Sequence, residues 1–247
     1  MADVERVEQQ PVWLLHHRPF RDTSRILDLL SREYGRVAVV ARGSRSAKSK
    51  LKGILRPFMP LSVSWIARSD LGTLTGAEIG GEPVSLGGDA LLSGYYLNEL
   101  LLNLMHRHDP QPEIFDAYTK TVTGLAGALE VAPRLRVFEI ELLRLLGYAL
   151  DFEHETATHE VLEPAAKYEF RPAQGPARVG DREGPMVFRG AELLGIAKGR
   201  LDEAETLNAA NRLLRGVIAY HLDGKELKSR KVLREIRRAG QGSSPTN

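Results

Sequence analysis

The hydrophobic pattern of the chain changes near residue 80, and this change constrains the fold more than any other feature. Before it lie five short β-rich runs, at residues 12–17, 26–30, 37–41, 61–67 and 71–79. Beyond it, apolar residues recur every three or four positions, which is the spacing of one helix face. Two glycine pairs, at 80–81 and 87–88, separate the two patterns. The sequence therefore predicts an α+β protein in which a β domain precedes a helical domain.

The five runs predict a small antiparallel barrel, because short strands joined by polar turns favour closed all-β folds. Residues 33–36 have the composition of a hairpin connection between the second and third strands. A long polar segment, residues 42–56, separates the third strand from the fourth, and we call it the connector. An OB-fold needs an insertion at this place, although the pattern alone does not name that topology.

Helical periodicity is clearest over residues 91–105, 115–129, 133–146 and 202–222. Between the last two lies a segment rich in proline and glycine, residues 151–195, with weak strand signals near 167–171 and 186–189. Such a composition predicts an irregular or β-containing insertion in the helical domain.

A length of 247 residues also favours two domains, since one domain typically has about 150 residues. We expect a β domain over residues 1–80 and a helical domain over residues 81–240. The polar C-terminal residues 241–247 are predicted to form a disordered tail.

Positive charge is concentrated in two segments, although the formal net charge of the whole chain is only +2. The first segment has seven basic residues and no acidic one: Arg36, Arg42, Arg45, Lys48, Lys50, Lys52 and Arg56. The second, residues 225–238, has seven basic residues against two acidic ones, and it includes Lys228, Arg230, Lys231 and Arg234. Because Lys and Arg that neutralise phosphates release counterions, this pattern predicts a surface for a nucleic-acid backbone. The plainer alternative is a solvated loop and a basic terminal helix.

Three aromatic residues of the β domain are candidates to stack on unpaired bases: Phe20, Tyr34 and Trp65. In so small a barrel an aromatic side chain often belongs to the core instead, and this alternative stays open for each of them. The exposed fraction of each side chain would distinguish the two roles.

The residues of common active sites are missing. The chain has no cysteine, which excludes disulfides, thiolate catalysis and zinc sites built from cysteine. Lys48-Ser49 could end a phosphate-binding loop, but Arg42 and Ala47 stand where that loop needs glycine. His154 and His159 have neighbouring glutamates, but their spacing is too loose to predict a metal site. We therefore expect no enzymatic activity, no metal and no cofactor.

Paired catalytic carboxylates are not predicted either. Glu139 and Glu141 lie two positions apart on a predicted helix, so their side chains face different directions. We expect them to pair with Arg136 and Arg144 instead.

No targeting segment is predicted. The N-terminus carries Asp3, Glu5 and Glu8, and no apolar core of a signal peptide follows them. The longest apolar stretch, residues 97–105, is interrupted by polar residues and is far shorter than the roughly 18 residues of a membrane span. We expect a cytoplasmic protein without membrane contact.

An ordered set of short motifs resembles the RecO family of DNA repair and recombination mediators. The motifs are HRPFRDTS at 17–24, GRV at 35–37, VARGSR at 40–45, LKG at 51–53, NELL at 98–101, RVFE at 136–139, LLGY at 145–148 and LKSR at 227–230. They occur in this order along nearly the whole chain, and the set is more specific than any one of its members.

The resemblance implies an N-terminal OB-fold, a helical C-terminal domain and a bacterial, cytoplasmic, nucleoid-associated protein of the RecF pathway. Members of this family bind single- and double-stranded DNA and anneal complementary strands. They contact the C-terminal tail of single-stranded DNA-binding protein (SSB), and with RecR they help to load RecA onto SSB-coated DNA. These properties are what the resemblance implies for this chain.

The resemblance also implies roles for particular residues. The basic positions of the family's OB-fold match Arg36, Arg42, Arg45, Lys48 and Lys52. For the site that receives the SSB tail, the best match is Arg136, next to Phe138, since a guanidinium binds a carboxylate with two hydrogen bonds. The alternative for Arg136 is a surface pair with Glu139. Lys228 and Arg230 match a C-terminal basic motif of the family.

One departure from the family concerns residues 151–195. Many members carry a four-cysteine zinc module in this segment, and this chain has no cysteine. We expect packing alone to hold the segment together.

Three other functions remain open at this stage. An OB-fold protein of translation or RNA turnover would show the same charges, because only contacts to the 2′-hydroxyl distinguish RNA from DNA. A nuclease or nucleotide hydrolase would need carboxylates near the connector, and the nearest in sequence are Asp22, Asp28 and Glu33. A protein adaptor would bind no nucleic acid.

Overall fold

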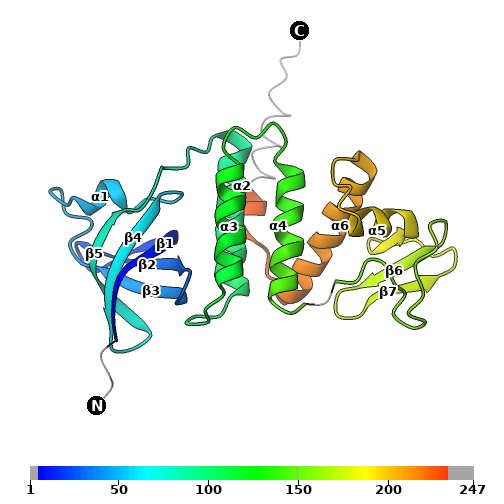
Figure 1. The fold of residues 1–247 in the computed structure, drawn as a ribbon, viewed down its shortest axis with the longest axis horizontal. Coiled ribbons are helices and arrows are strands. Elements are labelled where there is room, and N and C mark those ends of the chain that lie inside the picture. The colour runs from blue at the N-terminus through cyan, green and yellow to red at the C-terminus, as the bar shows by residue number, and fades with distance from the viewer. Residues whose placement is uncertain (1–4, 149, 233–247) are drawn as a thin grey trace, which may run out of the picture. The chain divides into compact units, whose positions relative to one another are not determined.

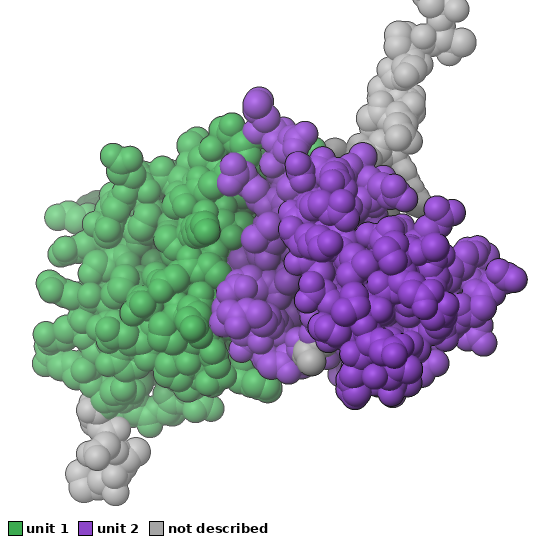
Figure 2. Space-filling view, turned by 45° about the vertical axis from the view of Figure 1, so that its right-hand side comes forward, with its two compact units in different colours: residues 1–128, 227–247 green, residues 129–226 purple. Residues whose placement is uncertain are grey.

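The computed structural model describes residues 5–148 and 150–232, and the chain divides into two compact units (Figures 1 and 2). Unit 1 contains residues 1–128 and 227–247, and unit 2 contains residues 129–226. The predicted tail at 241–247 lies outside the described residues. Among the described residues, no helix has the length and apolar character needed to cross a membrane.

Unit 1 begins with a closed barrel of five strands (Figure 1). The strands are β1 (Glu5–Phe20), β2 (Ser24–Ser31), β3 (Gly35–Ala41), β4 (Pro60–Ala67) and β5 (Leu71–Ile79), and a short helix, α1 (Leu51–Ile54), lies within the connector. They pair in the order β1-β2-β3-β5-β4, and β1 closes the barrel on β4. This is the predicted OB-fold. The expectation of a fully antiparallel barrel was wrong at one place, because β3 and β5 run parallel.

Strand β1 pairs with two neighbours, β2 and β4. Its register shifts once against each of them, and these two irregularities bend the strand. Its register shifts between Val7 and Gln10 against β4, and between Leu14 and His16 against β2. Bulges of this kind increase local twist and let one strand serve two partners of a barrel.

The interior of the barrel is filled by alternating buried residues from β1, β2, β3 and β4, against which Leu74 and Ala77 of β5 pack partly buried, and the connector completes it. Its buried members are Val7, Val12, Leu14, Leu27, Leu29, Val37, Val39, Ala41, Leu55, Met59, Leu61, Val63 and Trp65. Burying one such Val or Leu side chain contributes about 1.5–3 kcal/mol, so this cluster is the main source of stability for the barrel.

Helices α2 (Gly88–Leu104) and α3 (Pro112–Gly124) cover part of the outside of the same barrel. The Asn98 side chain donates a hydrogen bond to the backbone carbonyl of Leu15 at 2.9 Å, and the Tyr118 hydroxyl donates to Asn98 at 2.6 Å. Burial raises the pKa of Tyr118, so this hydroxyl remains a donor. The indole of Trp13 donates to the Thr119 hydroxyl at 2.8 Å. These bonds fix the two helices against β1.

Helix α3 ends earlier than the sequence predicted. The apolar stripe was expected to continue to Leu129, but the helix stops at Gly124 and the Leu129 side chain is fully exposed, at 102%. Leu125 is the last buried residue of the stripe.

The described residues of unit 2 form three helices and a three-stranded sheet. The helices are α4 (Ala132–Leu145), α5 (Gly190–Ala197) and α6 (Ala204–His221), and the strands are β6 (Lys167–Arg171), β7 (Gly175–Val179) and β8 (Val187–Arg189). Helix α6 packs against both α4 and α5, and β6 is the central strand of the sheet. The weak strand signals near 167–171 and 186–189 are thereby confirmed, while β7 was not foreseen.

Aromatic packing holds the segment of residues 151–195 together. Phe152, Tyr168, Phe170 and Phe188 are buried, and the rings of Phe152 and Phe170 lie 5.7 Å apart. The Tyr168 hydroxyl accepts a hydrogen bond from the backbone N–H of Glu163 at 2.9 Å. This aromatic cluster therefore joins the sheet to the preceding segment, which contains Phe152.

Truncating this cluster should destabilise unit 2, whereas removing metal should not. We expect Phe170→Ala to lower the free energy of unfolding by about 3–5 kcal/mol, because a large buried ring leaves a cavity. Urea denaturation followed by circular dichroism measures the loss. The melting temperature of the unsubstituted protein should be the same with and without EDTA, and a drop in EDTA would contradict packing as the source of stability.

Candidate nucleic-acid interface

The connector presents its cations to solvent. Six of its basic side chains are exposed: Arg42, Arg45, Lys48, Lys50, Lys52 and Arg56. Within residues 5–148 and 150–232, none of the six forms an ion pair. Their charge is therefore available to an anionic partner.

The apolar residues of the connector anchor it to the barrel. Leu51, Ile54 and Leu55 pack against the barrel core. The buried Ser44 hydroxyl donates to the carbonyl of Ala41 at 2.8 Å, and the backbone N–H of Arg45 donates to Thr23 at 2.8 Å. The connector is thus fixed against the barrel, with its apolar side chains toward the core and its cationic side chains toward solvent.

The turn between β1 and β2 adds cations that sequence reasoning missed. The Arg45 guanidinium donates to the carbonyl of Arg21 at 3.3 Å, which brings the connector against this turn. Arg18 and Arg21 are exposed, and Arg25 is half-buried directly opposite Ala41 of β3. These arginines are about 20 positions from the connector in sequence, so only the strand pairing places them together.

The three aromatic candidates have different environments. Trp65 is only 3% exposed, because it continues the inward alternation of Leu61 and Val63 on β4, so of the two roles left open for it the structure shows the core role. Tyr34 packs edge-on against Trp65 at 5.2 Å and belongs to the margin of the core. Phe20 is half-buried at the end of β1, with the Arg21 guanidinium 5.2 Å from its ring, and is the aromatic at the basic surface.

Arg36 does not belong to the exposed group. Its guanidinium donates to the backbone carbonyl of Leu102 in α2, and the side chain is half-buried there. Burial, and then the neighbouring charge of Arg107, lower the pKa of Arg36 from its usual value. This side chain joins the barrel to a helix and lies apart from the exposed connector cations, and its role as a phosphate contact stays a prediction.

The residues predicted to meet the SSB tail lie inside unit 2. Arg136 is 7% exposed, and its guanidinium donates to Glu139 and to Asn211, each at 2.6 Å. Phe138 is 1% exposed. The assignment of Arg136 and Phe138 as tail-binding residues is therefore wrong for this fold. The predicted Arg136–Glu139 pair is confirmed, but it is buried rather than at the surface.

Arg136 should instead contribute to stability. We expect Arg136→Ala to lower the free energy of unfolding by about 3–5 kcal/mol, since it removes the guanidinium that pairs with the buried Glu139 carboxylate. Arg144→Ala on the same helix breaks the exposed pair with Glu141, 2.8 Å, and should cost less than about 1 kcal/mol. Urea titration of both variants measures the difference, and equal losses would contradict the assignment.

The C-terminal basic motif is docked on α2. Glu99 accepts hydrogen bonds from the backbone N–H groups of Lys228 and Ser229, both at 2.8 Å, and from the Ser229 hydroxyl at 2.6 Å. The Arg230 guanidinium donates to the Tyr96 hydroxyl at 2.7 Å and lies over its ring. Lys228 and Lys231 are exposed, and Arg234 lies outside the described residues. Glu99 therefore caps the helical turn that begins at Lys228, a role with no local sequence signal.

Removing this cap should release the motif. In Glu99→Ala we expect the amide hydrogens of residues 228 and 229 to exchange at least about tenfold faster, because bonds to a charged acceptor contribute about 1.5–3 kcal/mol each. Hydrogen exchange with mass spectrometry measures this. Glu82→Ala, at an exposed loop position, is the matched control. Unchanged exchange in Glu99→Ala would show that the cap does not hold the segment.

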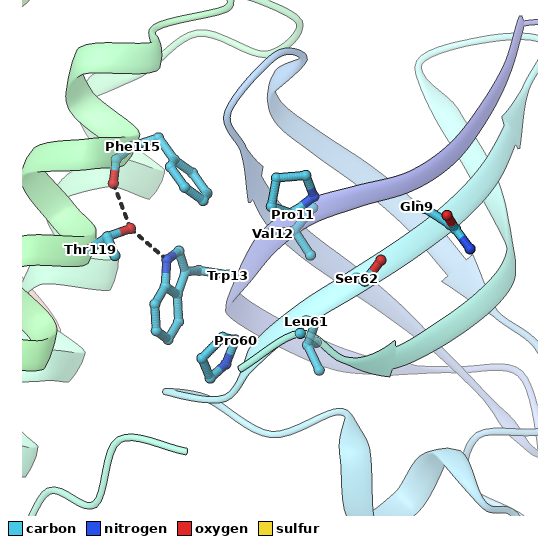
Figure 3. Close-up of a pocket in the computed structure, with 10 residues that line it drawn as sticks. Gln9, Pro11, Val12, Trp13, Pro60, Leu61, Ser62, Phe115 and Thr119 are labelled. Carbon is cyan, nitrogen blue, oxygen red and sulfur yellow. Dashed lines mark hydrogen bonds between the residues drawn. The ribbon is translucent and has the colours of Figure 1, made fainter. Parts of the chain in front are cut away.

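A shallow apolar pocket of about 200 Å³ lies between β1, β4 and α3 (Figure 3). Trp13, Phe115, Pro60 and Leu61 line it, and the indole of Trp13 points to Thr119. No titratable side chain contributes to its wall, so the pocket lacks an acid or base for catalysis. Among the described residues, no group of three or more His, Asp or Glu side chains could hold a metal ion.

An OB-fold with a held, cationic connector has the features of nucleic-acid-binding proteins. The family model for the N-terminal domain of recombination protein O matches residues 6–81, and the model for its C-terminal domain matches residues 87–231. The chain belongs to the recombination protein O (RecO) family.

Relatives of known name cover nearly the whole chain. The DNA repair protein RecO of Nitrosococcus oceani is 42% identical over 240 residues, which are 96% of this chain and 97% of that protein. The DNA repair protein RecO of Aromatoleum aromaticum is 42% identical over 238 residues, 96% of this chain and 99% of that protein. That of Methylococcus capsulatus is 39% identical over 233 residues, 94% and 96% of the two chains. Family membership supports a role in DNA repair and recombination.

Proposed function

We propose that this protein is a non-enzymatic mediator of recombinational repair that binds DNA through the connector surface. The observation that supports this is the set of six exposed connector cations, none of them in an ion pair within the described part of the chain. Contacts to phosphate position a protein on nucleic acid and carry no sequence information. Such a surface suits a protein that must act at any damaged sequence.

The same chemistry accounts for binding to both single- and double-stranded DNA. A phosphate contact needs no unpaired base, so a cationic surface accepts either form. Strand annealing follows when one cationic surface holds two strands, screens their repulsion and leaves their bases free to pair. The protein thereby promotes annealing without forming or breaking a covalent bond.

The proposal extends to the partners that the family resemblance implies. Binding to the SSB tail would hold the protein at SSB-coated DNA and raise its effective concentration there. With RecR, the protein would then help RecA to replace SSB at the nucleoid. Because Arg136 and Phe138 are buried, the surface that meets the tail consists of other residues.

Charge reversal in the connector tests the proposal. Five contacts to a single strand give a slope of log K against log salt of roughly −3.5, and three fewer contacts reduce it by about 2. We expect the triple variant Arg42→Glu, Arg45→Glu, Lys48→Glu to bind single-stranded oligonucleotides more weakly and with this shallower slope. Fluorescence anisotropy at several salt concentrations measures binding, and a fluorescence assay with complementary oligonucleotides measures annealing with and without SSB.

The matched control carries the same change in net charge elsewhere. Lys120, Lys198 and Arg215 are exposed, and their triple substitution by Glu should leave the slope unchanged. Equal affinity and slope for the connector variant and the unsubstituted protein would remove the connector from the mechanism. If RNA of the same sequence displaces the bound oligonucleotide at a lower concentration than unlabelled DNA does, an RNA-directed function is favoured instead.

A further inference from the structure

The strand pairing orders the side chains on the outside of the barrel into rows. Leu27, Leu29, Val37 and Val39 point into the core, so their neighbours on β2 and β3 point outward. The outward rows, read across β1, β2 and β3, are Trp13-Leu30-Arg36, His16-Asp28-Ala38, Arg18-Ile26-Val40 and the pair Phe20-Ser24. Successive rows on β2 and β3 are about 6.6 Å apart, the rise of two strand residues.

Helices cover one end of this face. The first row meets α2 and α3 through the bonds of Trp13 to Thr119 and of Arg36 to Leu102. In the next rows His16 and Arg18 are exposed, and Val40 and Phe20 are half-buried. The other members of these rows, Ser24, Ile26, Asp28 and Ala38, are buried, so the exposed part of this face is a strip of β1 side chains that leads from the β1–β2 turn, beside the connector, toward the covered end.

The loop between α2 and α3 is fixed against the covered end of this strip. The backbone N–H of His108 donates to the carbonyl of Arg36 at 3.0 Å, and Arg107 forms a parallel bridge with Arg36. Gly35, with φ of +63°, allows this approach, because a Cβ there would overlap the backbone carbonyl of Asp109. The loop thereby extends the edge of β3 and holds Arg107 in place.

Arg107 is oriented but not buried. Its guanidinium contacts the Asp28 carboxylate at 3.2 Å, in the His16 row, and its side chain is 41% exposed. His16 faces the same carboxylate at 3.8 Å. Since a guanidinium has five N–H donors and the bond to Asp28 uses one, Arg107 retains donors for a second anion. Asp28 is itself nearly buried, so it orients the cation more than it blocks access.

We propose that Arg107 is a phosphate contact at the far end of this strip, so that one nucleic-acid strand crosses from the connector over Phe20 and Arg18 to the α2–α3 loop. The inference rests on the proposed function and adds a helical-region residue to the barrel surface. Phe20 provides the face on which one base stacks, between the cations at the two ends. The path gives a role to the exposed Arg18 and the half-buried Phe20, which both lie on β1.

Single substitutions along the strip test the path. Arg107→Gln and Arg18→Gln each remove one cation, and each should weaken single-strand binding about fivefold at 0.1 M salt and reduce the salt slope by about 0.7. Arg107→Lys keeps the charge and should restore the slope. Phe20→Ala should weaken binding about tenfold without changing the slope, since stacking releases no counterion. Anisotropy titrations with an oligothymidylate measure all four.

The controls separate this inference from the proposed function. Lys120→Gln removes an exposed cation from α3, which contributes none of the open rows, and should leave the slope unchanged. Thermal melts confirm that each variant is folded before titration. If the connector variant binds weakly while Arg107→Gln and Arg18→Gln bind as the unsubstituted protein does, the path is wrong and the proposed function stands. If the unsubstituted protein shows no salt-dependent binding, the proposed function itself is wrong.

Discussion

The contact of α2 and α3 with the outside of the barrel determines which part of the barrel surface in unit 1 is accessible to a ligand. At its centre, buried Asn98 bonds the carbonyl of Leu15 and accepts from Tyr118. Buried polar groups of this kind are costly unless each finds its partner, so the network allows few alternative positions of the helices. It decides which rows of the sheet are covered and which remain open to a ligand.

The same division between covered and open surface appears in the connector. Its apolar residues complete the barrel core, while its cations face solvent. A segment with this arrangement is held by hydrophobic burial, which salt does not weaken, and binds through charge, which salt does weaken. Folding and ligand binding therefore depend on different forces within one stretch of 15 residues.

Features set by local periodicity could be predicted from the sequence. The five strands, the connector and most helices follow from the spacing of apolar residues, because this spacing reflects which side of an element is buried. The end of α3 at Gly124 could not be predicted in this way, because Leu129 continues the apolar spacing but its side chain is exposed. Strand β7 escaped notice because its glycine and proline are rare in strands, and pairing with β6 outweighs that preference.

The sequence did not predict the environment of a residue where that environment depends on contacts with distant parts of the chain. Arg36 and Arg136 read as surface cations, yet Leu102 and Asn211 lie 66 and 75 positions away from them. Arg107 reaches the barrel only because its loop pairs with the first residues of β3, and Glu99 caps a turn 129 positions further on. No local pattern encodes such contacts.

The docking of residues 227–230 on α2 also has a consequence for the order of folding during synthesis. The last segment of unit 1 follows the whole of unit 2 in the chain. The ribosome therefore synthesises all of residues 129–226 before the last segment of unit 1, and proteins fold in units as they emerge. Until that moment Glu99 has no backbone partner from this segment, and a chain interrupted before residue 227 carries an incomplete first unit beside a complete second one.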